Sequence, residues 1–102
     1  MPSNSAYRLF ELGDRMTELS GTNERFRIRW AKSSRRHLVG RGHARFVMQT
    51  AVPLVVPATE EHEDRYSWIG YDDRGVELEV GAVRFPDCLM VTHVMATALR
   101  RR

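Results

Sequence analysis

Four histidines are the obvious candidates for acid–base chemistry in this chain, because an imidazole exchanges a proton near neutral pH. His37 and His43 lie in a segment rich in arginine, His93 follows the apolar run 88–91, and His62 lies in an acidic stretch. Each could act as a general acid or base. A surface or helix-capping role is the alternative for each.

The sequence lacks the usual metal and nucleophile motifs. It contains no HExxH, CxxC or GxSxG pattern and no phosphate-cradling glycine loop, and the single Cys88 has no convincing base beside it. Glu60, Glu61, His62, Glu63 and Asp64 are contiguous, so their side chains cannot easily converge on one ion. We therefore predict no metal and no cofactor. Cleavage of RNA fits this inventory, because the 2′-hydroxyl is itself the nucleophile and the protein supplies only a base, an acid and cations.

Positive charge is concentrated in residues 24–45, which carry eight basic residues and one acidic residue, whereas residues 46–80 carry two basic and eight acidic residues. All sixteen basic residues except Lys32 are arginine, which grips phosphate bidentately. A genome rich in G and C would give the same bias without any function. The side chains that we predict to bind RNA are Arg35, Arg36, Arg41 and Arg45.

An arginine stripe, formed by Arg25, Arg27 and Arg29, alternates with apolar residues. In a strand these side chains would project from one face of a sheet about 6–7 Å apart. They could follow a phosphate backbone. The interpretation that we favour is an ion-pair ladder with Glu77 and Glu79, which alternate with the same period and carry the opposite charge.

Composition predicts a single globular domain. The chain has 102 residues, of which 42% are hydrophobic and 28% charged, and this length suits one core. It contains no apolar run near the roughly 20 residues of a membrane span and no signal-peptide core at its start. We expect a cytoplasmic protein with a reduced cysteine. Residues 1–22 are predicted as an N-terminal arm or weak helix, from apolar spacing within 6–19, and residues 23–102 as one α+β domain.

Hydrophobic periodicity and turn residues indicate the elements that must position these side chains. A strand is predicted over 25–30, a short helix within 31–39, and a second helix over 43–50 that Pro53 ends. Further strands are predicted at 54–56, 66–70, 76–80 and 88–91, with a hairpin turn at 72–75. The predicted class is α+β, with strand, helix and helix followed by an antiparallel β-meander, and both helices packed on one face of the sheet.

The order of these segments resembles the BrnT toxins, which are ribonucleases of bacterial type II toxin–antitoxin pairs with a RelE/ParE-like scaffold. The matching pieces are Phe26-Arg27-Ile28-Arg29-Trp30, the basic segment with His37, Arg65-Tyr66-Ser67-Trp68-Ile69-Gly70 and Gly75-Val76-Glu77-Leu78-Glu79-Val80. The resemblance covers residues 24–99. The chain departs from the family where Gly42 precedes His43 instead of a histidine preceding a glycine, and where His93 stands in place of an arginine.

This resemblance implies a metal-independent endoribonuclease toxin that cleaves RNA by 2′-hydroxyl attack and blocks translation or growth. Arg65 would stabilise the charge of the phosphorane, His37 or His93 would act as base or acid, and Lys32 carries over to the same catalytic set. The implied partners are an RNA substrate, an acidic or amphipathic antitoxin, operator DNA reached only through that antitoxin, and a second copy in a homodimer.

Two other interpretations stay open. A non-catalytic basic module that binds nucleic acid or a protein partner would explain the uneven charge equally well. A purely structural domain would explain the apolar stripes, and Trp30 and Trp68 are expected to be core residues rather than platforms for stacked bases. Loss of an activity in Arg65 or His93 variants would identify an enzyme, whereas weaker binding alone would identify a module.

Overall fold

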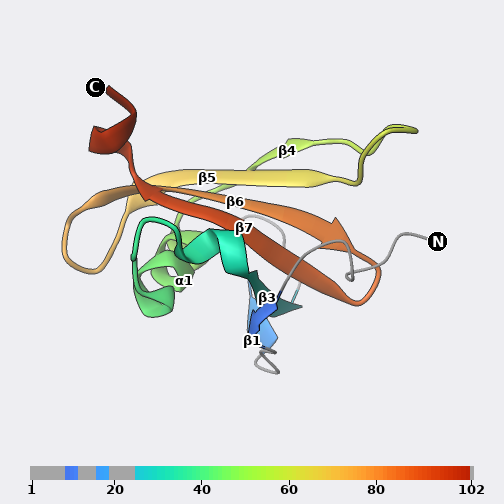
Figure 1. The fold of residues 1–102 in the computed structure, drawn as a ribbon, viewed down its shortest axis with the longest axis horizontal. Coiled ribbons are helices and arrows are strands. Elements are labelled where there is room, and N and C mark those ends of the chain that lie inside the picture. Colours follow the sequence, from blue (N-terminus) through green and yellow to red (C-terminus); the bar gives the residue numbers. More distant parts are fainter. Residues whose placement is uncertain (1–8, 12–15, 19–24, 102) are drawn as a thin grey trace.

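A mixed β-sheet forms the body of this α+β protein (Figure 1). The computed structural model describes residues 9–11, 16–18 and 25–101, and within them the sheet has seven strands. They are β1 Leu9–Glu11, β2 Met16–Glu18, β3 Arg25–Ala31, β4 Leu54–Val56, β5 Arg65–Tyr71, β6 Glu77–Phe85 and β7 Cys88–Ala96. Six of them lie in the order β1-β3-β7-β6-β5-β4, and β2 also pairs with β3.

Strands β4 to β7 form the predicted antiparallel meander. Strand β3 lies beside β7 and runs parallel to it, with Ile28, Arg29 and Trp30 opposite residues 89–91. The parallel pair is what makes the sheet mixed. Its position also means that the first long strand adjoins the last one, although some sixty residues separate them in the sequence.

The predicted alternation of β3 is confirmed. Phe26, Ile28 and Trp30 are buried, whereas Arg27 and Arg29 are half-buried on the opposite face of the sheet. Successive strand residues point to opposite faces, so the apolar half of the pattern is available to pack against a helix.

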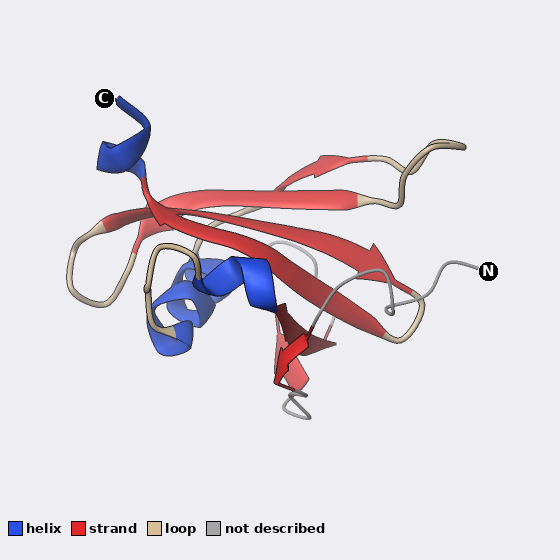
Figure 2. Ribbon diagram, in the orientation of Figure 1, coloured by secondary structure: helices blue, strands red, loops and turns tan. Residues whose placement is uncertain are grey.

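Helix α1 (Arg41–Thr50) covers this apolar face of the sheet (Figure 2). Ala44, Val47 and Met48 are fully buried against the sheet, as their helical spacing predicts. The helix starts two residues before the predicted helix over 43–50 and ends ahead of Pro53. It is the one α-helix in the part of the chain that the structure describes.

The short helix predicted within 31–39 is replaced by a 3-10 helix of four residues, η2 (Lys32–Arg35). No side chain caps its start. The Ser34 hydroxyl instead donates back to the Ala31 carbonyl at 2.7 Å, and the Ser33 hydroxyl donates to the Thr92 carbonyl of β7 at 2.8 Å. Leu38 then adopts a left-handed backbone conformation, with φ of 58°, which interrupts any continuing helix. The expectation of two helices on one face is therefore corrected to one.

The N-terminal segment is predicted as an arm or weak helix, from apolar spacing within residues 6–19. The described residues there are strands β1 and β2, and both pair antiparallel with β3. The remaining residues of the predicted arm lie outside the described ranges, and the boundary at residue 22 stays a prediction.

The predicted ion-pair ladder does not form, because β7 lies between β3 and β6. Arg29 instead lies 3.6 Å from Asp87 in the turn that follows β6. Glu79, which is buried, pairs with His93 and with Arg100 of the C-terminal 3-10 helix η3 (Thr97–Arg101).

The far edge of the sheet is the three-residue strand β4, bounded by Pro53 and Pro57. All three of its residues are exposed. No helix among the described residues is long and apolar enough to cross a membrane.

Close packing of α1 on β5 makes a prediction about Gly70. A Cβ added there would lie 2.9 Å from Ala51 Cβ, so we expect Gly70→Ala to lower the free energy of unfolding in urea by about 1–3 kcal/mol. Gly42→Ala in α1 is the matched control, because nothing lies within 4 Å of its added Cβ. Alanine there should stabilise the helix by up to ~1 kcal/mol. Equal stabilities of Gly70→Ala and wild type would contradict the described packing.

Candidate functional site

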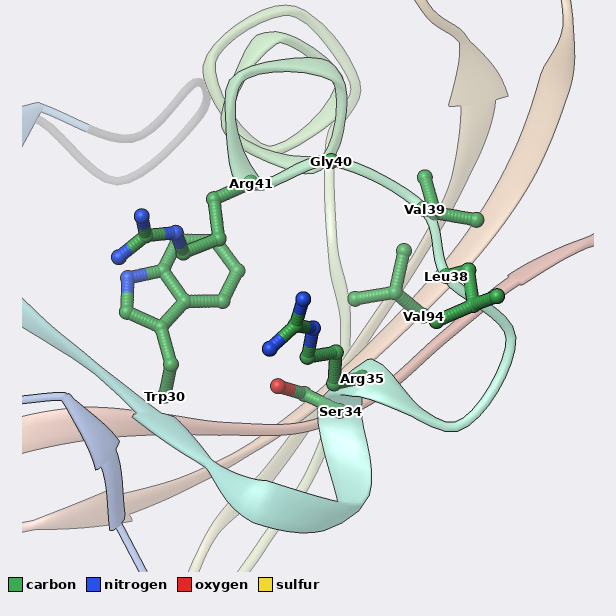
Figure 3. A pocket seen from close by; sticks show the side chains of 8 residues that line it. All are labelled: Trp30, Ser34, Arg35, Leu38, Val39, Gly40, Arg41 and Val94. Carbon is green, nitrogen blue, oxygen red and sulfur yellow. The ribbon is translucent and has the colours of Figure 1, made fainter.

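A cavity lies at the start of α1, where the helix, η2 and strands β3 and β7 meet (Figure 3). Its volume is about 330 Å³. Because β3 ends at Ala31 and α1 begins at Arg41, the connecting segment must reverse direction there, and it forms the rim. The lining residues are Trp30, Ser34, Arg35, Leu38, Val39, Gly40, Arg41 and Val94.

Trp30 forms one wall of this cavity and is 1% exposed. Its Nε1 is buried and finds no hydrogen-bond acceptor within the described part of the chain. The Arg45 guanidinium lies over the ring, 5.5 Å from the centroid, in a cation–π contact. A buried N–H without an acceptor costs free energy, so an acceptor atom on a ligand that reached Nε1 would be favoured.

Two guanidinium groups extend across the cavity toward Trp30, one from Arg35 of η2 and one from Arg41 of α1 (Figure 3). The Ser34 hydroxyl is engaged with the backbone and therefore shapes η2 rather than the cavity. None of the lining residues is acidic. The cavity therefore combines positive charge with an apolar wall.

The N-terminus of α1 adds to this positive potential. Gly40 is the N-cap, no side chain caps the helix, and its first turn contains no acidic residue. The unpaired N–H groups of a helix N-terminus carry a partial positive charge and attract anions. Since Gly40 and Arg41 line the cavity, helix and guanidinium groups favour the same kind of ligand, an anion such as a phosphate.

A second cavity, of about 380 Å³, shares Gly40 with the first. Its wall includes a histidine and a carboxylate from distant parts of the sequence. The lining residues are Gly40, Gly42, His43, Arg45, Phe46, Gln49 and Asp73.

His43 and Asp73 form a hydrogen-bonded pair in this second cavity, with Nδ1 and Oδ1 2.5 Å apart. An ionised carboxylate can only accept, so Nδ1 donates and Nε2 is left as the acceptor of a neutral ring. The hydrogen bond with His43 lowers the pKa of Asp73 below its ordinary value, although partial burial acts in the opposite direction. A histidine oriented in this way can take up a proton at Nε2.

Asp72 fixes the turn that presents Asp73. Its buried carboxylate accepts two hydrogen bonds from the Arg74 guanidinium, at 2.7 and 2.9 Å, and further bonds from the N–H groups of Arg74 and Val76. Burial alone would raise the pKa of Asp72, but these hydrogen bonds outweigh it and lower the pKa to about 2. Gly75 completes the predicted hairpin turn with φ of 81°.

The cluster of His43, Asp72 and Asp73 has its ligand atoms within 4.8 Å of one another, which is close enough to hold a metal ion. The contacts fit a different role. Both oxygens of Asp72 are already engaged by Arg74 and the backbone. The donor set therefore suits a histidine–carboxylate pair supported by an ion pair better than a cation.

The residues predicted as catalytic do not gather in one place. His37 and His93 come together, with ring centroids 5.9 Å apart, and His93 Nε2 lies 3.0 Å from Glu79 Oε2. Arg65 is exposed at the start of β5, which is two strands from β7, or about 10 Å. Lys32 is exposed at the first residue of η2.

Three of the four arginines predicted to bind RNA surround Trp30. Arg35 and Arg41 line the first cavity and Arg45 lies over the ring, whereas Arg36 is exposed and lines neither cavity. Sequence reasoning correctly placed Trp30 in the core but missed its place in the cavity wall. It also missed the pairing of His43 with Asp73, whose segment it interpreted only as a hairpin turn.

Comparisons of the chain with protein-family models, with curated proteins and with solved structures find no match.

Acid stability tests the role of Asp72. Its pKa is lowered from 3.8 to about 2 in the folded protein, so as pH falls the unfolded chain takes up the proton first and the free energy of unfolding decreases. The stabilisation is fully present above pH ~4 and is lost as pH falls toward ~2. We expect Asp72→Asn to be less stable than wild type at pH 7 and to show a flatter decline over this acid range in urea unfolding. The exposed Glu60→Gln is the control, and parallel acid profiles for Asp72→Asn and wild type would contradict this role.

Inorganic phosphate should bind in the cavity beside Trp30. We expect its addition to shift the indole N–H resonance of Trp30 in an NMR titration, because an acceptor reaches the wall of the cavity. Trp68 is an internal control, since its Nε1 is also buried and unpartnered among the described residues but does not line the cavity. Equal shifts of both resonances, or none, would argue against this anion site.

Proposed function

We propose that the chain is a metal-independent endoribonuclease that holds an RNA phosphate in the cavity at the start of α1. The observation that carries the proposal is the convergence on Trp30 of two guanidinium groups from different elements, beside an uncapped helix N-terminus. Such donors are suited to a phosphodiester in the ground state and to the greater charge of its transition state.

The apolar part of the cavity supports a nucleotide rather than a free inorganic ion. Leu38, Val39 and Val94 line it together with the Trp30 ring, so a sugar or base attached to the phosphate would have an apolar surface to contact. Leu38 is 80% exposed, which extends this surface outward from the cavity. A chain of nucleotides could continue past it toward Lys32, which is exposed at the start of η2.

From the sequence resemblance we propose that the protein is of the BrnT type and that its sheet is a RelE/ParE-like scaffold. Supporting this is the order of a first strand, a basic segment with one helix, and an antiparallel meander beside the first strand. In this proposal the chain is a cytoplasmic toxin that blocks translation or growth, and an acidic or amphipathic antitoxin covers the cavity. DNA is contacted only through that antitoxin, and a second copy of the toxin completes a homodimer.

The non-catalytic module is the second candidate, and one observation favours it. Arg65 lies two strands away from the strand of His93, so the set implied by the resemblance does not converge on a single phosphate. An RNA-binding protein would need the arginines around Trp30 but no acid or base. Cleavage separates the two candidates.

Removal of the two cavity arginines tests the proposal. Charge-assisted hydrogen bonds contribute about 1.5–3 kcal/mol each, so we expect the double variant Arg35→Gln/Arg41→Gln to bind single-stranded RNA about 100-fold more weakly or worse. Cleavage of end-labelled RNA in EDTA should fall with it. Arg36→Gln is the control for the loss of one positive charge, because it removes one guanidinium group from the same segment but outside both cavities.

The outcomes distinguish the candidates. Discrete cuts that survive EDTA and vanish in the double variant support the endoribonuclease. RNA that stays intact but binds with an affinity that falls as salt rises identifies the binding module. Equal losses of affinity in Arg36→Gln and the double variant would show that the cavity has no special role. Arg65→Ala, tested in parallel, decides whether the role implied for Arg65 belongs to this protein.

A further inference from the structure

We infer that His43 is the general base of the proposed cleavage and that Asp73 is its positioning residue. This inference rests on the proposed function and adds the group that removes the proton from the 2′-hydroxyl. It assigns the reaction to the boundary between the two cavities. The residues implied by the sequence resemblance do not include either member of this pair.

The orientation of the His43 ring is the first argument. Its Nδ1 donates to Asp73 Oδ1 at 2.5 Å, and Asp72 Oδ2 lies 3.9 Å from the same nitrogen. Both carboxylates that face the ring are therefore on its Nδ1 side. The opposite nitrogen, Nε2, is the one that can accept a proton.

The position of that nitrogen is the second argument. A Cβ added to Gly40 would lie 3.3 Å from His43 Cδ2 and 3.9 Å from Nε2, so the Cδ2–Nε2 edge of the ring faces Gly40. Gly40 lines both cavities. The proton-accepting nitrogen therefore lies beside the residue that the first and second cavities share. A Cβ on Gly40 would be in tight contact with the ring.

The supporting contacts form the third argument. Asp73 follows Asp72, whose carboxylate is held by the Arg74 guanidinium and by two backbone N–H groups. The turn that carries Asp73 is thus fixed before any ligand binds. An ionised Asp73 also stabilises the imidazolium that His43 becomes when it accepts a proton. This is the arrangement that a positioned base requires.

The step balances without a metal or a cofactor. The 2′-hydroxyl of RNA gives its proton to His43 Nε2, and the 2′-oxygen forms a bond to phosphorus as the bond to the 5′-oxygen breaks. The leaving 5′-oxygen takes a proton from water. Arg35 and Arg41 stabilise the charge on the phosphorus oxygens. The products carry a 2′,3′-cyclic phosphate and a 5′-hydroxyl. The hydroxide formed from that water then removes the proton from His43 and restores the base.

The test compares single-turnover cleavage of end-labelled RNA in EDTA by wild type, His43→Gln and Asp73→Asn, with RNA affinity measured for each. A general base contributes about 10²–10⁴-fold, so His43→Gln should lose at least 100-fold in rate while its RNA affinity stays within about threefold. Asp73→Asn should also lower the cleavage rate and alter its pH profile, since the Asp73 carboxylate holds the His43 ring and stabilises its protonated form. His62→Gln is the control, because among the described residues the His62 side chain hydrogen-bonds only to the Glu63 carbonyl.

Chemical rescue separates a catalytic role from a structural tie between α1 and the β5–β6 turn. Added imidazole should restore cleavage to His43→Ala, and RNA with a 2′-deoxy sugar at the cleaved position should bind without being cut. Wild-type cleavage that is retained in His43→Gln, or lost only in His93→Gln, overturns the assignment of the base and leaves the proposed function standing. Binding without cleavage by wild type overturns both.

Discussion

A difference in strand length controls the geometry around the cavity. Strand β3 ends one residue after Trp30, while its parallel neighbour β7 continues to Ala96. The edge of β7 that β3 leaves uncovered is taken by η2, through the Ser33 hydroxyl bonded to the Thr92 carbonyl. The chain must then return as α1 to cover the apolar face that contains Trp30. This single reversal brings segments from both sides of the connection to the same tryptophan.

The long-range order of the strands explains which parts of the fold could be predicted. Alternation identified β3 and the meander, and Pro53 correctly limited α1, because these signals act within a few residues. The neighbour of β3 could not be predicted, since it depends on a parallel pairing with the last strand. For the same reason the predicted ion-pair ladder between the arginines of β3 and the glutamates of β6 does not form. The 31–39 segment formed η2 because its serines bond to carbonyls instead of capping a helix.

The same holds for the candidate site: its local sequence signals were predictable, and its long-range contacts were not. Clustered arginines in the sequence pointed to the segment that forms the cavity rim. Trp30 was predicted from strand phase as a core residue, and it is one, but the end of a strand is also where a core residue borders an opening. The pair of His43 and Asp73 joins positions thirty residues apart, and no local motif connects them. Within the acidic half of the sequence, Arg74 neutralises Asp72, and Asp73 pairs with His43 of the basic half.

The short strand β4 has a consequence for how the protein behaves at high concentration. Its three residues are exposed and apolar, and an open sheet edge of that composition invites another chain to add a strand. Proline on both sides removes the backbone N–H donors that a longer added strand would need. Recruitment by this edge is therefore limited to a three-residue register. The protein thus keeps an apolar edge while restricting its growth into an extended, intermolecular sheet.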